Sequence, residues 1–343
     1  MDKVNSKERI QAVLAGDIPD RTPVMLHNFM MAVHESNVSM VQYRSCPETI
    51  AKVHLNAVEK YKYDGVVIDV DTCTLAGAVG VPVDFPEYEP ARVKGSRISC
   101  LEAIQEIEVP DISKNERVQI WLEACKIITK QTNGVVYIRG NCDQAPFSLA
   151  SMIRGVQDWL IELSEPQNEK YIHQLLVFSM QITLQFIELM SQTGVDMLSN
   201  GDSMASPDII SPEMYRKFAL PYEKAIAKHA HRLNKPYLLH ICGCADKIID
   251  DMTTVGADVI ELDFKTDINL IHQKCSGKLV FCGNIDPSKI LAMGTVSKVS
   301  EKVNELLRIY ADSPRFILNA GCAIPAGTPP ENIYEMIKAC KNF

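Results

Sequence analysis

The stretch PYLLHICGCADKIIDDMTTVGADVIELDFKTDINLIHQKCSGKLVFC, residues 236–282, holds three short apolar runs separated by amphipathic helical segments. The runs are Pro236–Ile241, Asp258–Leu262 and Lys278–Cys282. They are apolar with little alternation, which is the pattern of strands buried on both faces of a parallel sheet. Strands of this kind that alternate with helices predict an α/β fold.

The same rhythm continues on both sides of this stretch, with a helical pattern near Glu48–Tyr61 and a long one from near Gln167. Eight parallel strands joined by helices can close into a barrel, and a doubly wound open sheet is the main alternative. We predict a single (β/α)8 TIM barrel domain over residues 1–343, with an N-terminal helical segment. Leu75–Ser99, rich in Pro, Gly and acidic residues, is predicted to be a long loop or small hairpin after the second strand. The other five predicted strands are Thr22–Leu26, Gly65–Val70, Gly134–Gly140, Val195–Asn200 and Arg315–Ala320.

Composition narrows the class of protein. The chain has 343 residues, of which 46% are hydrophobic and 23% charged, with a net charge of −8. A surface that follows nucleic-acid phosphates needs clustered Lys and Arg, and no such cluster occurs, so we expect no nucleic-acid partner. The amino terminus lacks a signal-peptide core, and no stretch approaches the ~18 uninterrupted apolar residues of a membrane span. We therefore expect a cytoplasmic protein that does not enter a membrane, whose eleven cysteines are thiols or metal ligands.

Polar residues stand repeatedly at the predicted carboxyl ends of the strands. Barrel enzymes take their functional groups from these ends and from the loops that follow them. Each carboxylate, taken alone, is equally well explained as a helix cap or a turn residue. The set comprises Asp69, Asp71, Asn141, Asp143, Asn200, Asp202, His240, Cys242, Cys244, Glu261, Asp263, Asn284, Asp286 and Cys322.

The sequence His240-Ile241-Cys242-Gly243-Cys244 is the sharpest cluster. Residues two apart on an extended strand point to the same side, so His240 and Cys242 can face one metal ion. Cys322, after the last strand, can supply a third ligand from the same rim, which leaves a position open as in catalytic zinc sites. Cysteine is also a common buried apolar residue. We interpret six others in that way, namely Cys46, Cys73, Cys100, Cys125, Cys275 and Cys340.

Several short segments, in this order along the chain, together resemble a known family. They include Arg21-Thr-Pro-Val24, Gly140-Asn-Cys-Asp-Gln-Ala-Pro-Phe147, Ser211-Pro-Glu-Met-Tyr215 with Pro221-Tyr222, His240-Ile-Cys-Gly243, Gly283-Asn-Ile-Asp-Pro287, Gly321-Cys322 and Thr328-Pro-Pro-Glu-Asn332. The chain resembles the uroporphyrinogen decarboxylase superfamily, specifically its methylcobamide:coenzyme M methyltransferase branch. The resemblance extends over nearly the whole chain.

This resemblance implies a barrel in which His240, Cys242 and Cys322 bind zinc. Such enzymes transfer a methyl group between a corrinoid carried on a separate small protein and a thiol acceptor such as coenzyme M. The decarboxylase branch fits less well, because its Arg-rich loop after the first strand corresponds to His27–Glu35, which contains no Arg. The decarboxylases also have His where this chain has Cys322.

A zinc ion held by two thiolates and an imidazole would keep an incoming thiol deprotonated and nucleophilic. Glu261 is a candidate for the fourth metal position before substrate binds. Asp202 and Asp69 are candidates to orient the acceptor, to accept its proton or to support a metal ligand, although each can equally cap a helix. No Asp-x-His-x-x-Gly corrinoid motif occurs in the chain, so cobalamin is expected to arrive on a partner protein.

Three alternatives remain open from the sequence. The first is a metal-free decarboxylase that acts on a porphyrinogen or a smaller acid. The second is a non-catalytic module that docks a corrinoid or a metal. The third is a barrel that transfers methyl groups from a pterin or an aryl ether to cobalamin. The sequence leaves the acceptor, the direction of transfer and the oligomeric state undetermined.

Overall fold

Eight parallel strands form one sheet in the computed structural model, which describes residues 4–343, so that residues 1–3 of the predicted domain lie outside the described residues. Neighbouring strands pair in the order β1-β2-β5-β6-β7-β8-β9-β10. A parallel bridge between Val24 and Leu318 joins the last strand to the first, and Leu318 N–H donates to the carbonyl of Pro23 at 2.9 Å. The sheet therefore closes, and the predicted TIM barrel is confirmed against the open sheet. The strands are β1 (Met25–Leu26), β2 (Gly65–Ile68), β5 (Tyr137–Gln144), β6 (Met197–Gly201), β7 (Tyr237–Ile241), β8 (Val259–Leu262), β9 (Val280–Ile285) and β10 (Phe316–Ala320).

The predicted strand at Gly134–Gly140 differs most from the observed one. β5 begins at Tyr137 and continues four residues further, to Gln144. Gly134, at φ 74°, belongs to the turn before the strand. The segment Asn141–Gln144 continues the strand through an irregularity, because the register with β6 shifts between these two residues and Asp143 has φ 59°. All four side chains are buried, although polar residues normally end a strand prediction.

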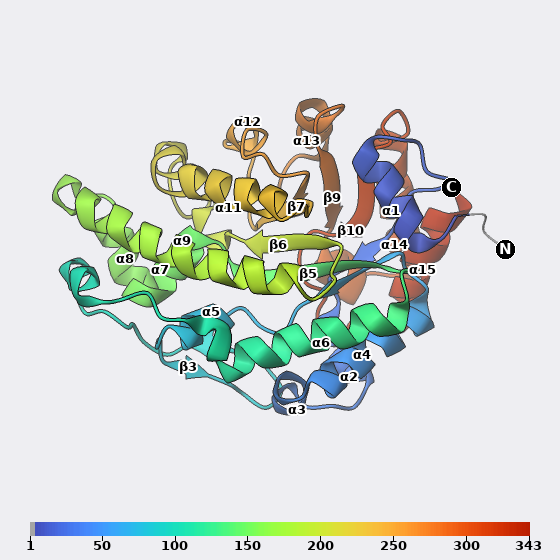
Figure 1. The fold of residues 1–343 in the computed structure, drawn as a ribbon. Helices are drawn as coiled ribbons and strands as arrows, with labels where there is room; N and C mark the ends of the chain where they lie inside the picture. Colours follow the sequence, from blue (N-terminus) through green and yellow to red (C-terminus); the bar gives the residue numbers. More distant parts are fainter. Residues whose placement is uncertain (1–3) are drawn as a thin grey trace.

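Helices surround the strands (Figure 1). Because each βα unit returns the chain to the same end of the barrel, all strand carboxyl ends meet at one rim. The predicted helix near Glu48–Tyr61 is confirmed as α4, and the long helix predicted from Gln167 begins two residues later, as α9. The main helices are α2 (Phe29–Glu35), α3 (Met40–Ser45), α4 (Pro47–Tyr61), α6 (Glu116–Thr132), α9 (Glu169–Ser191), α11 (Leu220–Arg232), α12 (Ile249–Met252), α13 (Ile268–Cys275), α14 (Val296–Ile309) and α15 (Pro330–Asn342).

The predicted N-terminal helical segment is α1 (Ser6–Ala15), which closes the amino end of the barrel. Its Ile10 and Val13 are fully buried in a cluster with residues from the strands, among them Met25 and Val67. The Arg9 guanidinium lies 2.7 Å from a carboxylate oxygen of the buried Asp64, just before β2. Apolar side chains and a buried ion pair thus close this end of the barrel. A functional site is therefore expected at the opposite rim.

The rim end carries the extra segments (Figure 1). Within Leu75–Ser99 the chain completes α5 (Thr74–Ala78) and then forms the predicted small hairpin, in which β3 (Val83–Asp84) pairs antiparallel with β4 (Arg92–Val93). Two further helices, α7 (Pro146–Arg154) and α8 (Val156–Glu162), follow β5 at the same end. These additions extend the wall around the mouth of the barrel.

Candidate metal centre

His240, Cys242 and Cys322 meet at this mouth. His240 is the fourth residue of β7, Cys242 directly follows that strand, and Cys322 follows β10. The Nε2 atom of His240 lies 3.0 Å from Sγ of Cys242, and the two sulfur atoms are 3.8 Å apart. One ligand atom from each residue falls within 4.8 Å of the other two. The structure thus brings together the three residues that were predicted to bind the metal.

Two glycines allow this close approach. Gly243, directly after Cys242, has φ 80°, and a Cβ there would lie 2.6 Å from side-chain oxygens of Asp208 and Ser206. A Cβ on Gly321, directly before Cys322, would lie 2.6 Å from the backbone nitrogen of Phe264. A side chain at position 321 would collide with the backbone, and one at position 243 would strain the left-handed backbone and push on the side chains of Asp208 and Ser206.

The donor set fits a zinc ion. Two thiolates bound at about 2.3 Å to a tetrahedral zinc ion lie roughly 3.8 Å apart, and the observed sulfur separation is 3.8 Å. The His240 Nε2 and Cys242 Sγ atoms are at hydrogen-bond distance, and metal binding as two thiolates and an imidazole requires that the protons held among the three residues leave. Two thiolates and one imidazole are three ligands, which leaves one tetrahedral position for another group.

The electrostatics of the three residues favour a thiolate at Cys242. A hydrogen bond from the Cys322 thiol lowers the pKa of Cys242, burial opposes that change, and the positive charge on His240 lowers the pKa further. The same hydrogen bond raises the pKa of Cys322. Ser203, in the loop after β6, donates from Oγ to Sγ of Cys242 at 3.2 Å. A nucleophilic, metal-binding form of the sulfur is therefore stabilised by its surroundings.

Glu261 lies behind the imidazole of His240. The two residues are paired in register on β7 and β8, and Oε2 of Glu261 is 3.3 Å from Nδ1 of His240. Arg139, across the barrel on β5, donates to both carboxylate oxygens at 2.8 and 2.9 Å, and Asn319 donates to Oε1 at 2.7 Å. Burial alone would raise the pKa of Glu261, but the Arg139 guanidinium and the neighbouring His240 hold the pKa well below its usual value.

This arrangement places Glu261 away from the fourth metal position. Its oxygens meet Nδ1 of His240, whereas the sulfur atoms lie on the Nε2 side. Its partners Arg139 and Asn319 are buried with it. A carboxylate in this position fixes the orientation of a histidine and the nitrogen that carries its proton.

Asp202 and Asp69 lie outside the group of three. Asp202 is fully buried, and its Oδ1 accepts from the N–H of Ser148 at 2.7 Å, in the first turn of α7. Burial raises the pKa of Asp202 to about 6. Asp69 directly follows β2, and its Oδ2 lies 2.7 Å from Nε2 of His27. Its Oδ1 is buried without a hydrogen-bond partner among the described residues.

The sequence reasoning missed Arg139, Ser203, Asn319 and His27. Arg139 left a detectable signal, since it is a single charged residue in the apolar run GVVYIRG. A charge within a buried strand requires a buried partner. Ser203 and Asn319 left none, because serine and asparagine are common in loops and at strand ends.

A comparison with family models decides the family. The model described as uroporphyrinogen decarboxylase (URO-D) matches residues 5–343. The chain belongs to the uroporphyrinogen decarboxylase family. The match covers all eight strands and all three candidate metal ligands, so it confirms the superfamily that the sequence motifs resemble.

The chain is similar to curated proteins of two kinds. A methylcobamide:CoM methyltransferase from Methanosarcina acetivorans is 26% identical, over 100% of this chain and 99% of its own length. A uroporphyrinogen decarboxylase from Geobacter metallireducens is also 26% identical, over 93% of this chain and 94% of its own. A solved methyltransferase structure from Methanosarcina mazei has a TM-score of 0.91 at 24% identity and covers 99% of both chains. The predicted resemblance to the methyltransferase branch is confirmed, and the structural match shows the fold.

Proposed function

We propose that this protein is a zinc-dependent methyltransferase that moves a methyl group between a corrinoid on a separate protein and a thiol such as coenzyme M. The observation that carries the proposal is the group His240, Cys242 and Cys322 at the barrel mouth, with sulfur atoms at zinc-binding separation. Full-length similarity to enzymes named methylcobamide:CoM methyltransferases supports it. We further propose that residues 1–343 act as one catalytic domain in the cytoplasm.

His240, Cys242 and Cys322 would hold the zinc ion, which when bound favours the thiolate form of the acceptor. Oε2 of Glu261 lies 3.3 Å from Nδ1 of His240, where its negative charge favours a positively charged imidazole, and Nε2 on the other side of the ring faces Sγ of Cys242. Ser203 donates a hydrogen bond to Cys242, which tempers the charge of that thiolate. Asp69, paired with His27, is a rim carboxylate with a free oxygen that can orient the acceptor or take its proton.

The transfer itself is a displacement at carbon. The acceptor sulfur forms a bond to the methyl carbon while the cobalt–carbon bond breaks, and the electron pair remains on cobalt. The protein positions the reacting groups and keeps water from the floor of the site. The described residues beneath the mouth, including Arg139, Glu261 and Asn319, are buried and hydrogen-bonded to one another. A corrinoid protein must therefore present its methyl group from the open side of the mouth.

Decarboxylation is the second candidate, because the decarboxylase from Geobacter metallireducens is as similar to this chain as the methyltransferase. A porphyrinogen carries several carboxylates and needs free cations at the mouth. In this chain α2 and its flanks, residues 27–35, contain no Arg, and the guanidinium of Arg139 is taken by Glu261. A decarboxylation without a metal would also give no role to the two candidate thiolate ligands, Cys242 and Cys322.

The test combines metal analysis with a spectroscopic assay. The purified protein should hold about one zinc ion per chain, and mixing it with methylated corrinoid protein and coenzyme M should produce cob(I)alamin. A chelator should abolish the reaction, and added zinc should restore it. Cys242→Ser should lose most of the zinc, whereas Cys244→Ser, the matched control, should keep it because Cys244 stands outside the group of three.

Four other results of these experiments would each indicate a different function or ligand set. A metal-free protein that decarboxylates a porphyrinogen would overturn the proposal. Full zinc and full turnover in Cys242→Ser would remove the ligand assignment. Stoichiometric zinc without methyl transfer to any of a panel of thiols would favour a docking module. Methyl transfer only from a pterin or an aryl ether to cobalamin would place the chain in the opposite half-reaction.

A further inference from the structure

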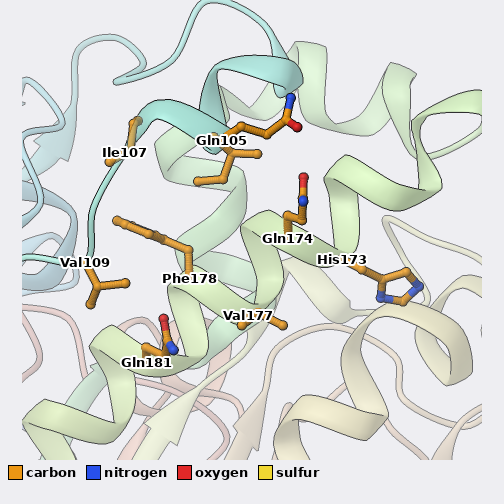
Figure 2. A pocket seen from close by; sticks show the side chains of 9 residues that line it. Gln105, Ile107, Val109, His173, Gln174, Val177, Phe178 and Gln181 are labelled. Atoms are coloured by element: carbon orange, nitrogen blue, oxygen red, sulfur yellow. The ribbon is translucent and has the colours of Figure 1, made fainter.

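Charge is distributed unevenly between the outer surface of the barrel and its rim. A shallow cleft of about 360 Å³ lies between α9 and the segment around Ile107, and its lining contains no Asp, Glu, Lys or Arg (Figure 2). The cleft therefore offers no fixed charge that could select a charged ligand. The rim differs, because the strand carboxyl ends carry Asp69, Asp71, Asp143, Asp202, Glu261, Asp263 and Asp286.

Several of these carboxylates form their hydrogen bonds inside the protein. Both oxygens of Asp263 accept from backbone N–H groups, at 3.1 Å each. Asp286 accepts from two backbone N–H groups, at 2.9 and 2.8 Å. Asp202 hydrogen-bonds to the N–H of Ser148 and to the carboxyl group of Glu223. These three residues therefore hold turns and helices in place.

A different group, which we call the acidic corner, consists of Asp69, Asp71 and Asp143. The first two follow β2, and Asp143 lies in the neighbouring strand β5. Each is at most 2% exposed. Asp71 and Asp143 each use one oxygen to accept a backbone N–H, from Cys73 at 2.8 Å and from Leu75 at 2.7 Å. The other oxygen of each, and Oδ1 of Asp69, have no partner among the described residues. Buried polar atoms are normally hydrogen-bonded, so three unpaired oxygens in one corner indicate a missing donor.

The corner also has an excess of negative charge. Burial raises the pKa of Asp143, and the charges of Asp71 and Asp69 raise it further. Arg44 lowers the pKa of Asp71, which burial raises. The Arg44 guanidinium, however, donates to two backbone carbonyls between β3 and β4, at 3.0 and 2.7 Å. One guanidinium thus stands against three carboxylates, and a bound cation would relieve their repulsion.

Hydrogen bonds connect the acidic corner to the metal centre. Oδ2 of Asp69 lies 2.7 Å from Nε2 of His27. The carbonyl oxygen of His27 accepts from the N–H of Ile324 at 2.8 Å, two residues beyond Cys322. The corner is therefore joined to the segment that carries one of the candidate zinc ligands.

An organic ammonium group fits the corner better than a second metal ion. Within residues 4–343, the only three His, Cys, Asp or Glu side chains with ligand atoms within 4.8 Å of one another are His240, Cys242 and Cys322. The oxygens of the corner are thus too widely spaced to surround a metal ion together. An ammonium group has three N–H donors, and its hydrogen bonds of about 2.8–3.2 Å are longer than metal–oxygen bonds.

We propose that the acidic corner binds the ammonium group of the methyl acceptor, so that the preferred acceptor is an aminothiol. The inference rests on the proposed function, because the thiol of the same molecule would occupy the open position at His240, Cys242 and Cys322. A thiol with a sulfonate would instead bring a second anion to buried carboxylates. Coenzyme M is therefore expected to react more slowly than an aminothiol of the same length.

Three thiols with the same ethyl chain test the proposal, namely cysteamine with an ammonium group, 2-mercaptoethanol with a hydroxyl and coenzyme M with a sulfonate. Their binding to the zinc-loaded, full-length protein is measured by calorimetry, and kcat/KM is measured from the appearance of cob(I)alamin. Cysteamine should exceed 2-mercaptoethanol at least about tenfold in both measurements, as expected for charge-assisted hydrogen bonds, and coenzyme M should be the weakest.

Variants assign the preference to the corner. Asp71→Asn and Asp143→Asn keep an oxygen for the backbone N–H, and asparagine tolerates the φ of 59° at position 143. Each should lower the ratio of cysteamine to 2-mercaptoethanol about tenfold, and this ratio cancels the intrinsic reactivity of each thiol. The matched control Asp286→Asn, at the end of β9, should keep the wild-type ratio. Zinc content and melting temperature identify any variant that is misfolded, and the ranking in wild type tests the proposal independently of the variants.

The outcomes separate this inference from the proposed function. Equal values for the three thiols, or a preference for coenzyme M, would overturn the inference while methyl transfer to a thiol stands. A preference for coenzyme M that Arg44→Gln abolishes would assign the corner to an anion, held by the unpaired Nε of Arg44. Tight binding of cysteamine without methyl transfer to any thiol would refute the proposed function and support the ammonium site.

Discussion

The variant Glu261→Gln separates the support of the metal centre from the stability of the barrel. The wild-type carboxylate accepts two hydrogen bonds from Arg139 and one from Asn319, all inside the protein, and it lies 3.3 Å from Nδ1 of His240. An amide has one oxygen and one NH₂ group, so it can no longer satisfy both guanidinium nitrogens. Arg139, 3% exposed, is left as a buried cation without a counter-charge.

Two effects of stated size follow. Loss of one partner of a buried ion pair costs about 3–5 kcal/mol, a large share of the roughly 5–15 kcal/mol that a folded domain has. Loss of the carboxylate behind a metal-binding histidine lowers metal affinity about 10–100-fold, which corresponds to roughly 1.4–2.8 kcal/mol. The first effect should appear in urea unfolding, and the second in competition for zinc with a chromophoric chelator.

Asp64→Asn is the matched control. Asp64 is also buried, and it pairs with Arg9 and Arg21 at 2.7 Å each, but it lies at the sealed amino end of the barrel. It should lose about the same 3–5 kcal/mol and keep wild-type zinc affinity. The reasoning is refuted if Glu261→Gln binds zinc as tightly as wild type, or if Asp64→Asn weakens zinc binding equally.

Three further predictions concern residues around the site and the core. Asp69→Asn should keep its zinc and raise KM for the thiol about tenfold with kcat within threefold, because Asp69 stands outside the group of three candidate ligands and its role is proposed to be binding of the acceptor; steady-state kinetics checks this, and an unchanged KM contradicts it. Asp202→Ala should cost about 1–2 kcal/mol in urea unfolding, as loss of the cap on α7 does, with zinc content and turnover unchanged; a large loss of kcat would assign Asp202 to the chemistry. His54 is buried, and burial lowers its pKa from 6.5 to about 4, so only the unfolded chain takes up its proton between these values. Stability should therefore be complete above pH 6.5 and fall by about 2–3 kcal/mol between pH 7 and 4.5; His54→Gln should show a shallower loss of urea midpoint over that range, and an equal slope would contradict the assignment.

The barrel could be predicted because its signals are local and repeated. Runs such as Asp258–Leu262 are apolar on both faces, and they recur with helices between them. The sequence still allowed a doubly wound open sheet, and the pairing of the last strand with the first, at Val24 and Leu318, decided the closure. The boundaries were less secure, as β5 shows, because polar residues in Asn141–Gln144 end a pattern but not a buried strand.

The three candidate metal ligands could also be predicted, for a reason that combines sequence with topology. His240 and Cys242 are two residues apart at a strand end, and Cys322 follows another strand of the same parallel set, so the fold brings all three to one rim. Their identity as His and Cys then indicates the kind of metal. Neither step requires knowledge of a side-chain contact.

The partners of the polar residues were decided by the tertiary structure alone. In the sequence Glu261 is one of several carboxylates at predicted strand ends. In the structure it accepts hydrogen bonds from Arg139, which lies across the barrel and 122 positions earlier in the chain. Asp202 reads in the same way, yet it caps α7. A sequence shows which residues are polar and near a strand end, but burial and the directions of side chains across a closed barrel determine whether each one touches the metal ligands, a helix or the substrate.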